Sequence, residues 1–417
     1  MSWKRRAFLT AGTAALGACR KSPAPPASGG SPHPASPKPW LTTPGGTAPD
    51  WSLLEKYQGL ITREDFVRLM TGVIAGDDSW NNYITVTPEA ALIDRSTPDD
   101  GLPRLVLRFA PPGSRLEVPR YWRRADELPA VIDPARPLEG LHIAIDPGHI
   151  GGAWAAMEER NFNGGEVKEG EITLRTARVL APMLDAAGAR VSMVRDALRP
   201  QTEPDWPALK EAARDSLIQS GEVLSEFTLD REARRLFCRS AEIRARARRV
   251  NDTLRPDVVV CLHFNAGGPW DNHLHILAHG CLTKDEMPLD DQRLECLLRL
   301  AQGCADTELP LCLAVAQSMA STTGLPAYTY RGTNARPHPA SPFVWMRNLL
   351  ANRLYQCPVV FCEPWVMNNP DLALRTKAGD YEGESMVAGK MRPSIFREYA
   401  ASVTAGLARY YGEHRNR

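Results

Sequence analysis

Three side chains able to bind a metal or transfer a proton follow three apolar runs of the sequence. Residues 143–145, 258–262 and 359–362 are short, mostly aliphatic runs, and His149, His263 and Glu363 come at or just after their ends. Runs of this kind, bounded by turn residues, predict buried strands. Ligands of open α/β sheets bind in the crevice beyond the carboxyl ends of the strands. The spacing therefore predicts one site at one edge of a sheet.

The residue types in this site fit zinc-dependent hydrolysis. Catalytic zinc takes three protein ligands from His, Glu or Cys and keeps one position for water. His149 and His263 supply two imidazoles. Three acidic residues could supply the third ligand: Glu166, Glu169 and Glu171. The metal lowers the pKa of its water and polarises the scissile carbonyl. A further carboxylate must take the water proton and pass it to the leaving amine, and Glu363 has that chemistry.

The elements that position these residues follow a strand–helix–strand pattern from Leu141 onward. Leu174, Ala177, Leu180 and Leu184 have helical spacing, Gly188 ends that helix, and residues 191–194 form the next strand. This alternation predicts an α/β fold with a central, mostly parallel sheet flanked by helices. Residues 206–254 are predicted to be mostly helical, and their arginine-rich part at 231–249 fits a solvated helix face.

Two other regions surround this pattern. Residues 51–137 are predicted to be a small α+β module, with a helix that Thr62 caps and strands at 83–87 and 105–109. Residues 138–417 would then form the catalytic domain. Within it, residues 283–342 are expected to be an insertion near the site, because this long stretch contains several prolines and a cysteine cluster.

Cysteine usage suggests disulfides. Eight cysteines follow Cys19, and an exported protein can pair an even number of them. The best candidates for bridges are the four that lie close together in sequence: Cys281, Cys296, Cys304 and Cys312. Cys261 and Cys362 lie in apolar strands and fit small buried hydrophobic residues.

The N-terminus resembles a bacterial export signal over residues 1–18. Arg5 and Arg6 resemble a twin-arginine motif, and Leu16-Gly17-Ala18-Cys19 resembles a lipobox, in which the cysteine is lipidated. An ordinary secretory signal with a coincidental arginine pair and cysteine is the alternative. Residues 19–50 are rich in Pro, Ser and Gly and are predicted to be a disordered tether.

These features predict a protein of the cell envelope, in the periplasm and anchored to a membrane through Cys19. Arg20 rather than Asp follows the cysteine, which favours the outer membrane in a Gram-negative cell. The net charge of +1 gives no reason to expect nucleic acid as a partner. After the N-terminus no apolar run approaches the roughly 18 residues that span a bilayer.

From Leu141 to its C-terminus the chain resembles the zinc-dependent N-acetylmuramoyl-L-alanine amidases, which cleave bacterial peptidoglycan. Matching motifs occur in the family's order. They are Ile145-Asp146-Pro147-Gly148-His149, Arg195-Asp196, Arg246 with Asn251, Leu262-His263-Phe264-Asn265-Ala266, Arg347, and Val359-Val360-Phe361-Cys362-Glu363 followed by Asn368-Asn369-Pro370. Ile150, where the family usually has glycine, and Pro364 depart from the pattern.

The resemblance implies hydrolysis of the amide between N-acetylmuramic acid and L-alanine. It implies that Zn²⁺ is held by His149, Glu169 and His263, and that Glu363 is catalytic. Glu169 is favoured because an apolar residue, Leu174, follows it at the family's spacing of five. Asn265 and Arg347 are expected to bind substrate, with capping of the strand-end turn as the alternative for Asn265.

Three alternatives remain open from the sequence. One is a catalytically inactive peptidoglycan-binding lipoprotein, and another is a related periplasmic zinc peptidase or amidohydrolase. The third concerns regulation, because residues 283–342 could block the site until an activating protein arrives. The favoured alternative is that the segment forms a disulfide-stapled wall of the substrate groove or is plain structural decoration.

Overall fold

The structure is a computed structural model that describes residues 48–95, 103–114, 116–267 and 271–415. The expected signal at 1–18, Cys19 with its lipobox, and nearly all of the tether at 19–50 lie outside the described residues. None of the helices in the described part combines the length and apolar character that crossing a bilayer requires.

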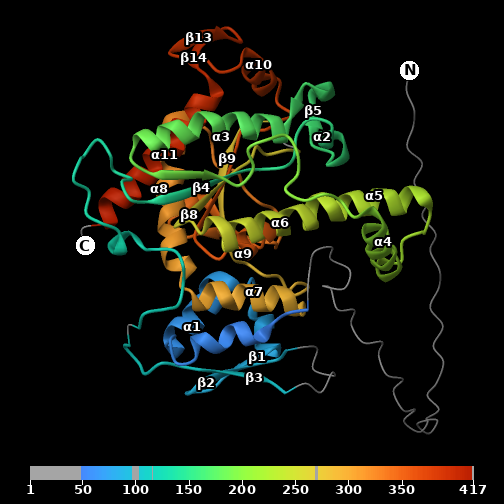
Figure 1. Ribbon diagram of the computed structural model, residues 1–417, viewed down its shortest axis with the longest axis vertical. Coiled ribbons are helices and arrows are strands. Elements are labelled where there is room, and N and C mark those ends of the chain that lie inside the picture. Colours follow the sequence, from blue (N-terminus) through green and yellow to red (C-terminus); the bar gives the residue numbers. More distant parts are fainter. Residues whose placement is uncertain (1–47, 96–102, 115, 268–270, 416–417) are drawn as a thin grey trace, which may run out of the picture. The chain divides into compact units, whose positions relative to one another are not determined.

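A seven-stranded sheet forms the centre of the molecule, in the order β10-β11-β9-β12-β8-β4-β7 (Figure 1). Its strands are β4 His142–Pro147, β7 Arg190–Met193, β8 Val258–Leu262, β9 Leu274–His279, β10 Ala335–His338, β11 Ser341–Arg347 and β12 Val359–Pro364. Strands β7, β4, β8 and β12 run parallel, whereas β9 runs antiparallel to β12. The α/β fold class predicted from the sequence is confirmed.

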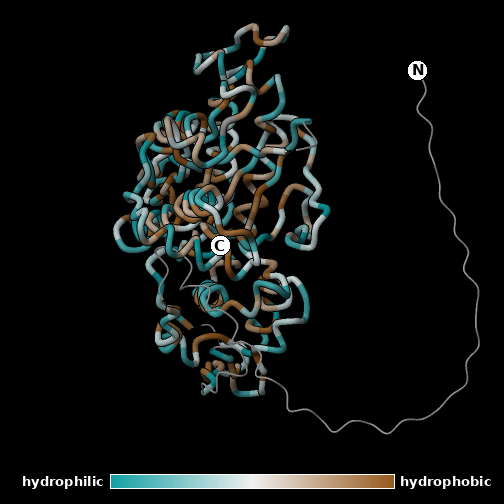
Figure 2. Tube along the Cα trace, turned by 90° about the vertical axis from the view of Figure 1, so that its right-hand side faces the viewer, coloured by the Kyte–Doolittle hydropathy of each residue, from teal (hydrophilic) through white to brown (hydrophobic). Residues whose placement is uncertain are grey.

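Helices cover both faces of this sheet. Three long helices pack on one face: α3 Glu169–Ala186, α8 Cys304–Thr323 and α11 Ile395–His414. The short helices α6 Glu242–Arg248 and α9 Leu350–Leu354 lie on the other. Figure 2 shows hydrophobic residues gathered along the central strands between these layers. The strands are buried on both sides, which explains why their sequences read as continuous apolar runs.

Residues 206–254 are helical, as predicted. Helices α4 Trp206–Ser220 and α5 Glu226–Leu236 form a hairpin, and α5 continues through a π-helical turn at Phe237–Ala241 into α6. Arg231 and Arg235 are about half exposed, which fits the expected solvated face. Arg246 differs, because it points into the protein and is almost completely buried.

The N-terminal module contains α1 Arg63–Leu69 and a three-stranded antiparallel sheet of β1 Ile84–Val86, β2 Ala90–Ile93 and β3 Leu105–Arg108. The Thr62 hydroxyl accepts a hydrogen bond from the Asp65 amide at 3.1 Å, so the predicted helix cap is confirmed. The buried apolar residues of α1 and of this sheet, such as Phe66, Ile93 and Leu107, belong to the same cluster as those of α3, α8 and α11.

The expectation that residues 283–342 form an insertion near the site holds only in part: Tyr330 lies 3.1 Å from His275, which contacts Glu363, but the helices of this stretch belong to the core. Helix α7 Asp290–Ala301 packs against the N-terminal module, where Arg293 donates to the Asp94 carbonyl at 2.8 Å. Helix α8 is a core helix in which Leu311, Cys312 and Val315 are fully buried. Removing this segment would therefore expose the core rather than uncover a blocked site.

The disulfide prediction is also wrong. All eight described cysteines are free thiols, and each is buried. The four proposed for bridging sit in different packing environments: Cys281 beside the N-terminal module, and Cys296, Cys304 and Cys312 in α7 and α8. They act as small hydrophobic residues, as Cys261 and Cys362 were predicted to do.

Several small elements complete the fold. They are α2 Trp154–Met157, the two-residue strands β5 Asn161–Phe162 and β6 Val167–Lys168, α10 Pro370–Ala378, and the hairpin of β13 Glu384–Val387 with β14 Lys390–Pro393. Figure 1 shows α2 and β5 close to the N-terminal end of α3.

Candidate metal centre

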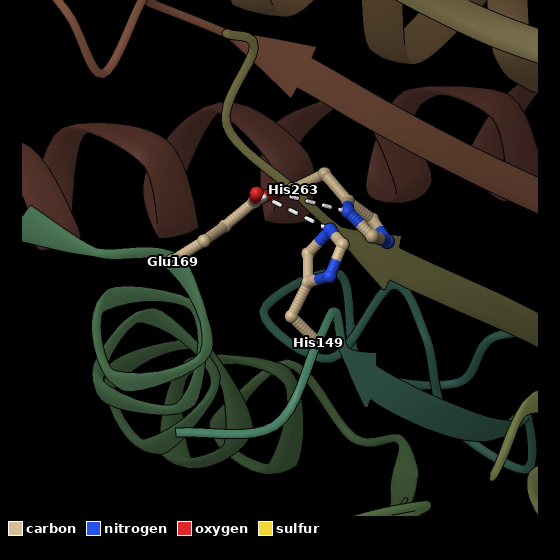
Figure 3. Close-up of side chains that lie close together, drawn as sticks. All are labelled: His149, Glu169 and His263. Carbon is tan, nitrogen blue, oxygen red and sulfur yellow. Dashed lines mark hydrogen bonds and ion pairs between the residues drawn. The ribbon is translucent and has the colours of Figure 1, made fainter. Parts of the chain in front are cut away.

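Two imidazoles and one carboxylate converge at the carboxyl edge of the sheet (Figure 3). His149 follows β4, Glu169 is the first residue of α3, and His263 follows β8. His149 Nε2 lies 3.2 Å from Glu169 Oε2, and His263 Nδ1 lies 3.2 Å from Glu169 Oε1. His149 has a φ of 60°, which is uncommon for a residue with a Cβ and typical of functional sites.

This donor set fits zinc. Nitrogen and oxygen ligands about 2.0–2.1 Å from a tetrahedral ion are about 3.3 Å apart, close to the 3.2 Å that separates each imidazole from the Glu169 carboxylate. Glu169 is only 2% exposed, and a buried carboxylate needs a compensating charge. His149, Glu169 and His263 would therefore hold the ion, with its remaining position open to water.

Glu158 is not one of the three candidate ligands, but its carboxylate contacts the His149 imidazole. Its Oε1 lies 3.5 Å from His149 Nδ1, and its Oε2 accepts the Ile150 amide at 2.7 Å. Burial alone would raise the pKa of Glu158, but the contact with His149 and nearby positive charge outweigh burial and lower it. A carboxylate on Nδ1 leaves Nε2 free for a metal. Sequence reasoning missed Glu158, because it lies in an irregular stretch with no periodic pattern.

Two glycines allow the three ligands to approach one another. A Cβ on Gly148 would lie 2.2 Å from the His263 ring, and one on Gly170 would lie 1.7 Å from the Ile150 carbonyl oxygen. Neither position can hold a side chain without moving the ligands. On its other side, His263 stacks on Phe361 with 4.2 Å between ring centroids.

Two buried arginines fix the turn that carries His149. Arg246 donates to the carbonyls of Pro147 and His149 at 2.9 and 2.7 Å and pairs with Asp146 at 2.9 Å. Arg195 donates to the Gly170 carbonyl at 2.9 Å, next to Glu169. Both arginines belong to motifs recognised in the sequence, and both act on the backbone that presents the ligands.

Glu363 ends a strand next to the one that carries His263. In the parallel pair of β12 and β8, Cys362 is opposite Leu262, so Glu363 and His263 occupy matching positions on strands about 4.8 Å apart. Burial alone would raise the pKa of Glu363. The close imidazole of His275 and the charges of His263 and Arg347 outweigh burial and hold it at about 2. Glu363 is therefore a carboxylate at neutral pH.

The other two acidic candidates lie apart from the three ligands. Glu166 is largely exposed, with Lys377 at 4.0 Å. Glu171 pairs with Lys168 at 3.2 Å and accepts the Gly152 amide at the same distance. Of the three acidic residues considered from the sequence, Glu169 is the one that faces both histidines.

Asn265 and Arg347, the residues expected to bind substrate, both make contacts within the protein. The Asn265 side chain lies 2.6 Å from His273 Nε2 and accepts the Ala266 amide at 2.8 Å, which fits the turn-capping alternative. Arg347 donates to the Tyr330 hydroxyl at 3.2 Å. Arg347 remains partly exposed on the same face of the sheet as Glu363.

A cavity of about 150 Å³ opens beside His149 and His263. His149, His263 and Phe361 line it from the sheet, and Ile243, Leu349 and Leu350 line it from the helices opposite. Arg239 stands at its border and is exposed. Apolar and charged side chains therefore both face the space next to His149 and His263.

Comparisons with known proteins found only distant structural likenesses. No protein-family model matches the chain, and no curated protein matches it. The chain is similar to the N-acetylmuramyl-L-alanine amidase Ami1 from Mycobacterium smegmatis, with 18% identity, 66% of this chain and 99% of that chain covered, and a TM-score of 0.39.

Two further solved structures are similar at lower identity. The CwlD amidase from Clostridioides difficile, in complex with the GerS lipoprotein, has 12% identity and a TM-score of 0.37, covering 65% of this chain and 98% of that one. The catalytic domain of CwlV, an N-acetylmuramoyl-L-alanine amidase from Bacillus (Paenibacillus) polymyxa var. colistinus, has 13% identity and a TM-score of 0.33. That match covers 65% of this chain and 97% of that one.

Proposed function

We propose that this protein is a zinc-dependent N-acetylmuramoyl-L-alanine amidase, which hydrolyses the amide between N-acetylmuramic acid and the stem peptide. The observation that carries the proposal is the convergence of His149, Glu169 and His263 within 4.8 Å at a sheet edge, with Glu363 on the adjoining strand. The ordered motifs from Leu141 to the C-terminus support the choice of substrate over other amides.

In this proposal each side chain has a distinct role. Bound zinc would polarise the scissile carbonyl and lower the pKa of the attacking water. Glu363 accepts a proton from the attacking water while the water oxygen bonds to the carbonyl carbon. It returns this proton to the amide nitrogen when the C–N bond breaks. The low pKa of Glu363 keeps it in the basic form needed for the first transfer. Arg246 and Glu158 keep His149 in place.

We also propose that the protein acts in the periplasm as a lipoprotein. The signal-like residues 1–18, the lipobox ending at Cys19 and the Pro-rich residues 19–50 support this. Lipidated Cys19 would anchor the chain to a membrane, the outer one in a Gram-negative cell. Residues 138–417 would carry the amidase activity and reach the wall through the tether.

Digestion of purified peptidoglycan tests the proposed activity. Zinc-loaded protein should release stem peptides that begin with L-alanine, and a chelator should stop the release. Cleavage between other residues of the stem peptide would instead identify a zinc peptidase. Binding to the wall without cleavage by fully zinc-loaded protein would identify a binding lipoprotein. Either of these two results would overturn the proposal.

A further inference from the structure

We propose that His275 is the positioning residue for Glu363, and that Tyr330 and Arg347 hold His275 in that role. The inference deepens the proposed amidase function, since it concerns the carboxylate that would handle the proton. It rests on a polar chain that links two motif residues, Glu363 and Arg347, through His275 and Tyr330, which belong to none of the motifs. In this chain, Arg347 contacts Tyr330, Tyr330 contacts His275, and His275 contacts Glu363.

The sheet register puts His275 against Glu363. Strand β9 runs antiparallel to β12, with His275 directly opposite Glu363. Directly opposed residues of antiparallel strands point to the same face with Cβ atoms about 4.5–5.5 Å apart. His275 Nε2 lies 3.5 Å from Glu363 Oε2, and the His275 side chain is only 1% exposed. The contact is therefore set by backbone pairing rather than by mobile surface side chains.

A second layer holds the imidazole. The Tyr330 hydroxyl lies 3.1 Å from His275 Nε2, and Arg347 Nη1 donates to the same hydroxyl at 3.2 Å. Burial and the negative charge of Glu363 raise the pKa of Tyr330, so its hydroxyl stays protonated. The backbone near Tyr330 is fixed too, because the Tyr328 amide donates to the Leu274 carbonyl at 3.0 Å.

The contacts of His275 favour one tautomer. Both polar neighbours face Nε2, whereas the buried Nδ1 has no hydrogen-bond partner among the described residues. A proton on Nδ1 would be a buried donor without an acceptor, at a cost of about 1–3 kcal/mol. A proton on Nε2 instead faces the oxygens of Tyr330 and Glu363. His275 Nε2 thus faces both the Tyr330 hydroxyl at 3.1 Å and Glu363 Oε2 at 3.5 Å, and this position fixes the imidazole beside the carboxylate.

Positioning of this kind has a specific kinetic consequence. A general base displaced by about 1 Å loses about 100-fold in rate even when substrate still binds. Loss of the His275 contact should therefore lower kcat more than it changes KM. Zinc content should stay the same, because His275 lies next to Glu363 rather than among the three metal ligands.

Strand β9 supplies a matched control. His279 lies four residues along the same strand on the same face, is also buried, and makes no side-chain hydrogen bond to another described residue. His275→Leu should lower kcat about 10- to 100-fold with KM changed less than about threefold, and His279→Leu should leave both near wild type. His275→Gln, which restores an N–H donor, should recover part of the loss.

Tyr330→Phe is a second test, needed if the His275 variants do not fold. Tyr330 is only partly buried, so its variant should fold. Removing its hydroxyl should lower kcat by about threefold to tenfold. Thermal unfolding and zinc content of every variant separate positioning from misfolding. Equal losses in His275→Leu and His279→Leu would overturn the inference, and so would an unchanged kcat in His275→Leu.

A measurement that does not depend on catalytic activity tests this inference separately from the proposed function. Carbon-13 NMR of glutamate carboxyls, with Glu363 assigned by its absence in Glu363→Gln, should place its titration midpoint near 2. His275→Leu should raise that midpoint by about one pH unit or more, while His263, Arg347 and Tyr330 remain beside Glu363. Wild-type protein inert on peptidoglycan would overturn the amidase proposal alone. An unchanged midpoint in His275→Leu would overturn the role of His275.

Discussion

The two faces of the central sheet differ in what their side chains do. On the face covered by α3, α8 and α11, the strands present apolar residues, among them Ile145, Val260, Leu262 and Cys362. On the face covered by α6 and α9, the next residues along the same strands are Asp146, Cys261, His263 and Glu363. Successive strand residues point to opposite faces. Two successive residues of one strand can therefore belong to different regions, the first to the apolar core and the second to the candidate site.

The covering helices match this division. Helices α8 and α11 are twenty residues each and α3 is eighteen, so they seal the apolar face. On the other face, α9 is five residues long and α6 is the inner part of the helical run that begins with α5; the cavity next to His149 and His263 lies under them, and we call this the short-helix face, after α9. The long-helix face should therefore determine stability, and the short-helix face should determine metal binding and catalysis.

The largest expected effect comes from Glu363 on the short-helix face. Glu363→Gln should lower kcat for peptidoglycan hydrolysis about 10²- to 10⁴-fold, the usual contribution of a general acid–base group. Zinc content should stay at one ion per chain. Glu171→Gln is the control, because Glu171 is a partly exposed neighbour of Glu169 that contacts neither histidine, and the amide keeps an acceptor for Gly152; activity should stay within about twofold. Near-normal turnover in Glu363→Gln would place the catalytic base elsewhere.

On the long-helix face, the expected effect is on stability. Leu407 of α11 is fully buried, so Leu407→Ala should lower the free energy of unfolding by about 2–5 kcal/mol. Denaturant titration measures this change. Below the unfolding transition, zinc affinity and kcat should match wild type. Leu374→Ala on α10, where the leucine is half exposed, should change stability by less than about 0.5 kcal/mol. A catalytic defect in folded Leu407→Ala protein would weaken the contrast between the faces.

Glu158 should give a smaller effect that is confined to metal binding. Replacing a carboxylate that supports a metal-bound histidine typically costs about 10- to 100-fold in metal affinity. Glu158→Gln keeps the shape and an acceptor for Ile150 but loses the charge beside His149. Isothermal titration with zinc should show the weaker binding. Unaltered affinity would mean that Glu158 serves only the Ile150 turn.

The smallest effect concerns the far end of β9. Burial, with the charges of Arg299 and Arg353, holds the pKa of His279 well below its usual value. The unfolded chain takes up a proton there near pH 6.5 and the folded protein does not. The free energy of unfolding therefore falls as pH drops below 6.5, by up to about 1.4 kcal/mol per pH unit. His279→Leu should lose less stability than wild type between pH 7 and pH 5. Equal losses in the two proteins would show that His279 becomes protonated in the folded state.

The sequence predicted the parts of this arrangement that depend on local pattern. Strands β4, β8 and β12 are apolar runs, and His149, His263 and Glu363 stand at their ends, so fold class and site edge follow from spacing. Glu169 was favoured among three acidic candidates through the resemblance, because Leu174 of α3 follows it at the family's spacing. These features need only a few neighbouring residues to be recognised.

What the sequence did not predict depends on pairing between distant segments. The contact of His275 with Glu363 exists because β9 turns antiparallel to β12, and no local pattern gives that direction. The four cysteines at 281–312 looked like a bridging cluster, but helix packing separates them. Residues 283–342 were predicted to be an insertion because prolines are disfavoured inside helices, so helix α8 was not recognised. This helix contains Pro310 in its first turns.

X-ray absorption spectroscopy at the zinc K edge tests the central claim most directly, with one zinc equivalent bound to the wild-type protein. Ligation by His149, Glu169 and His263 predicts only nitrogen and oxygen neighbours at about 2.0–2.1 Å, with the outer-shell scattering of two imidazoles. That outer-shell signal should fall in His263→Ala protein. Sulfur neighbours at about 2.3 Å, or failure to retain one zinc per chain, would contradict the claim that these three residues are the metal site.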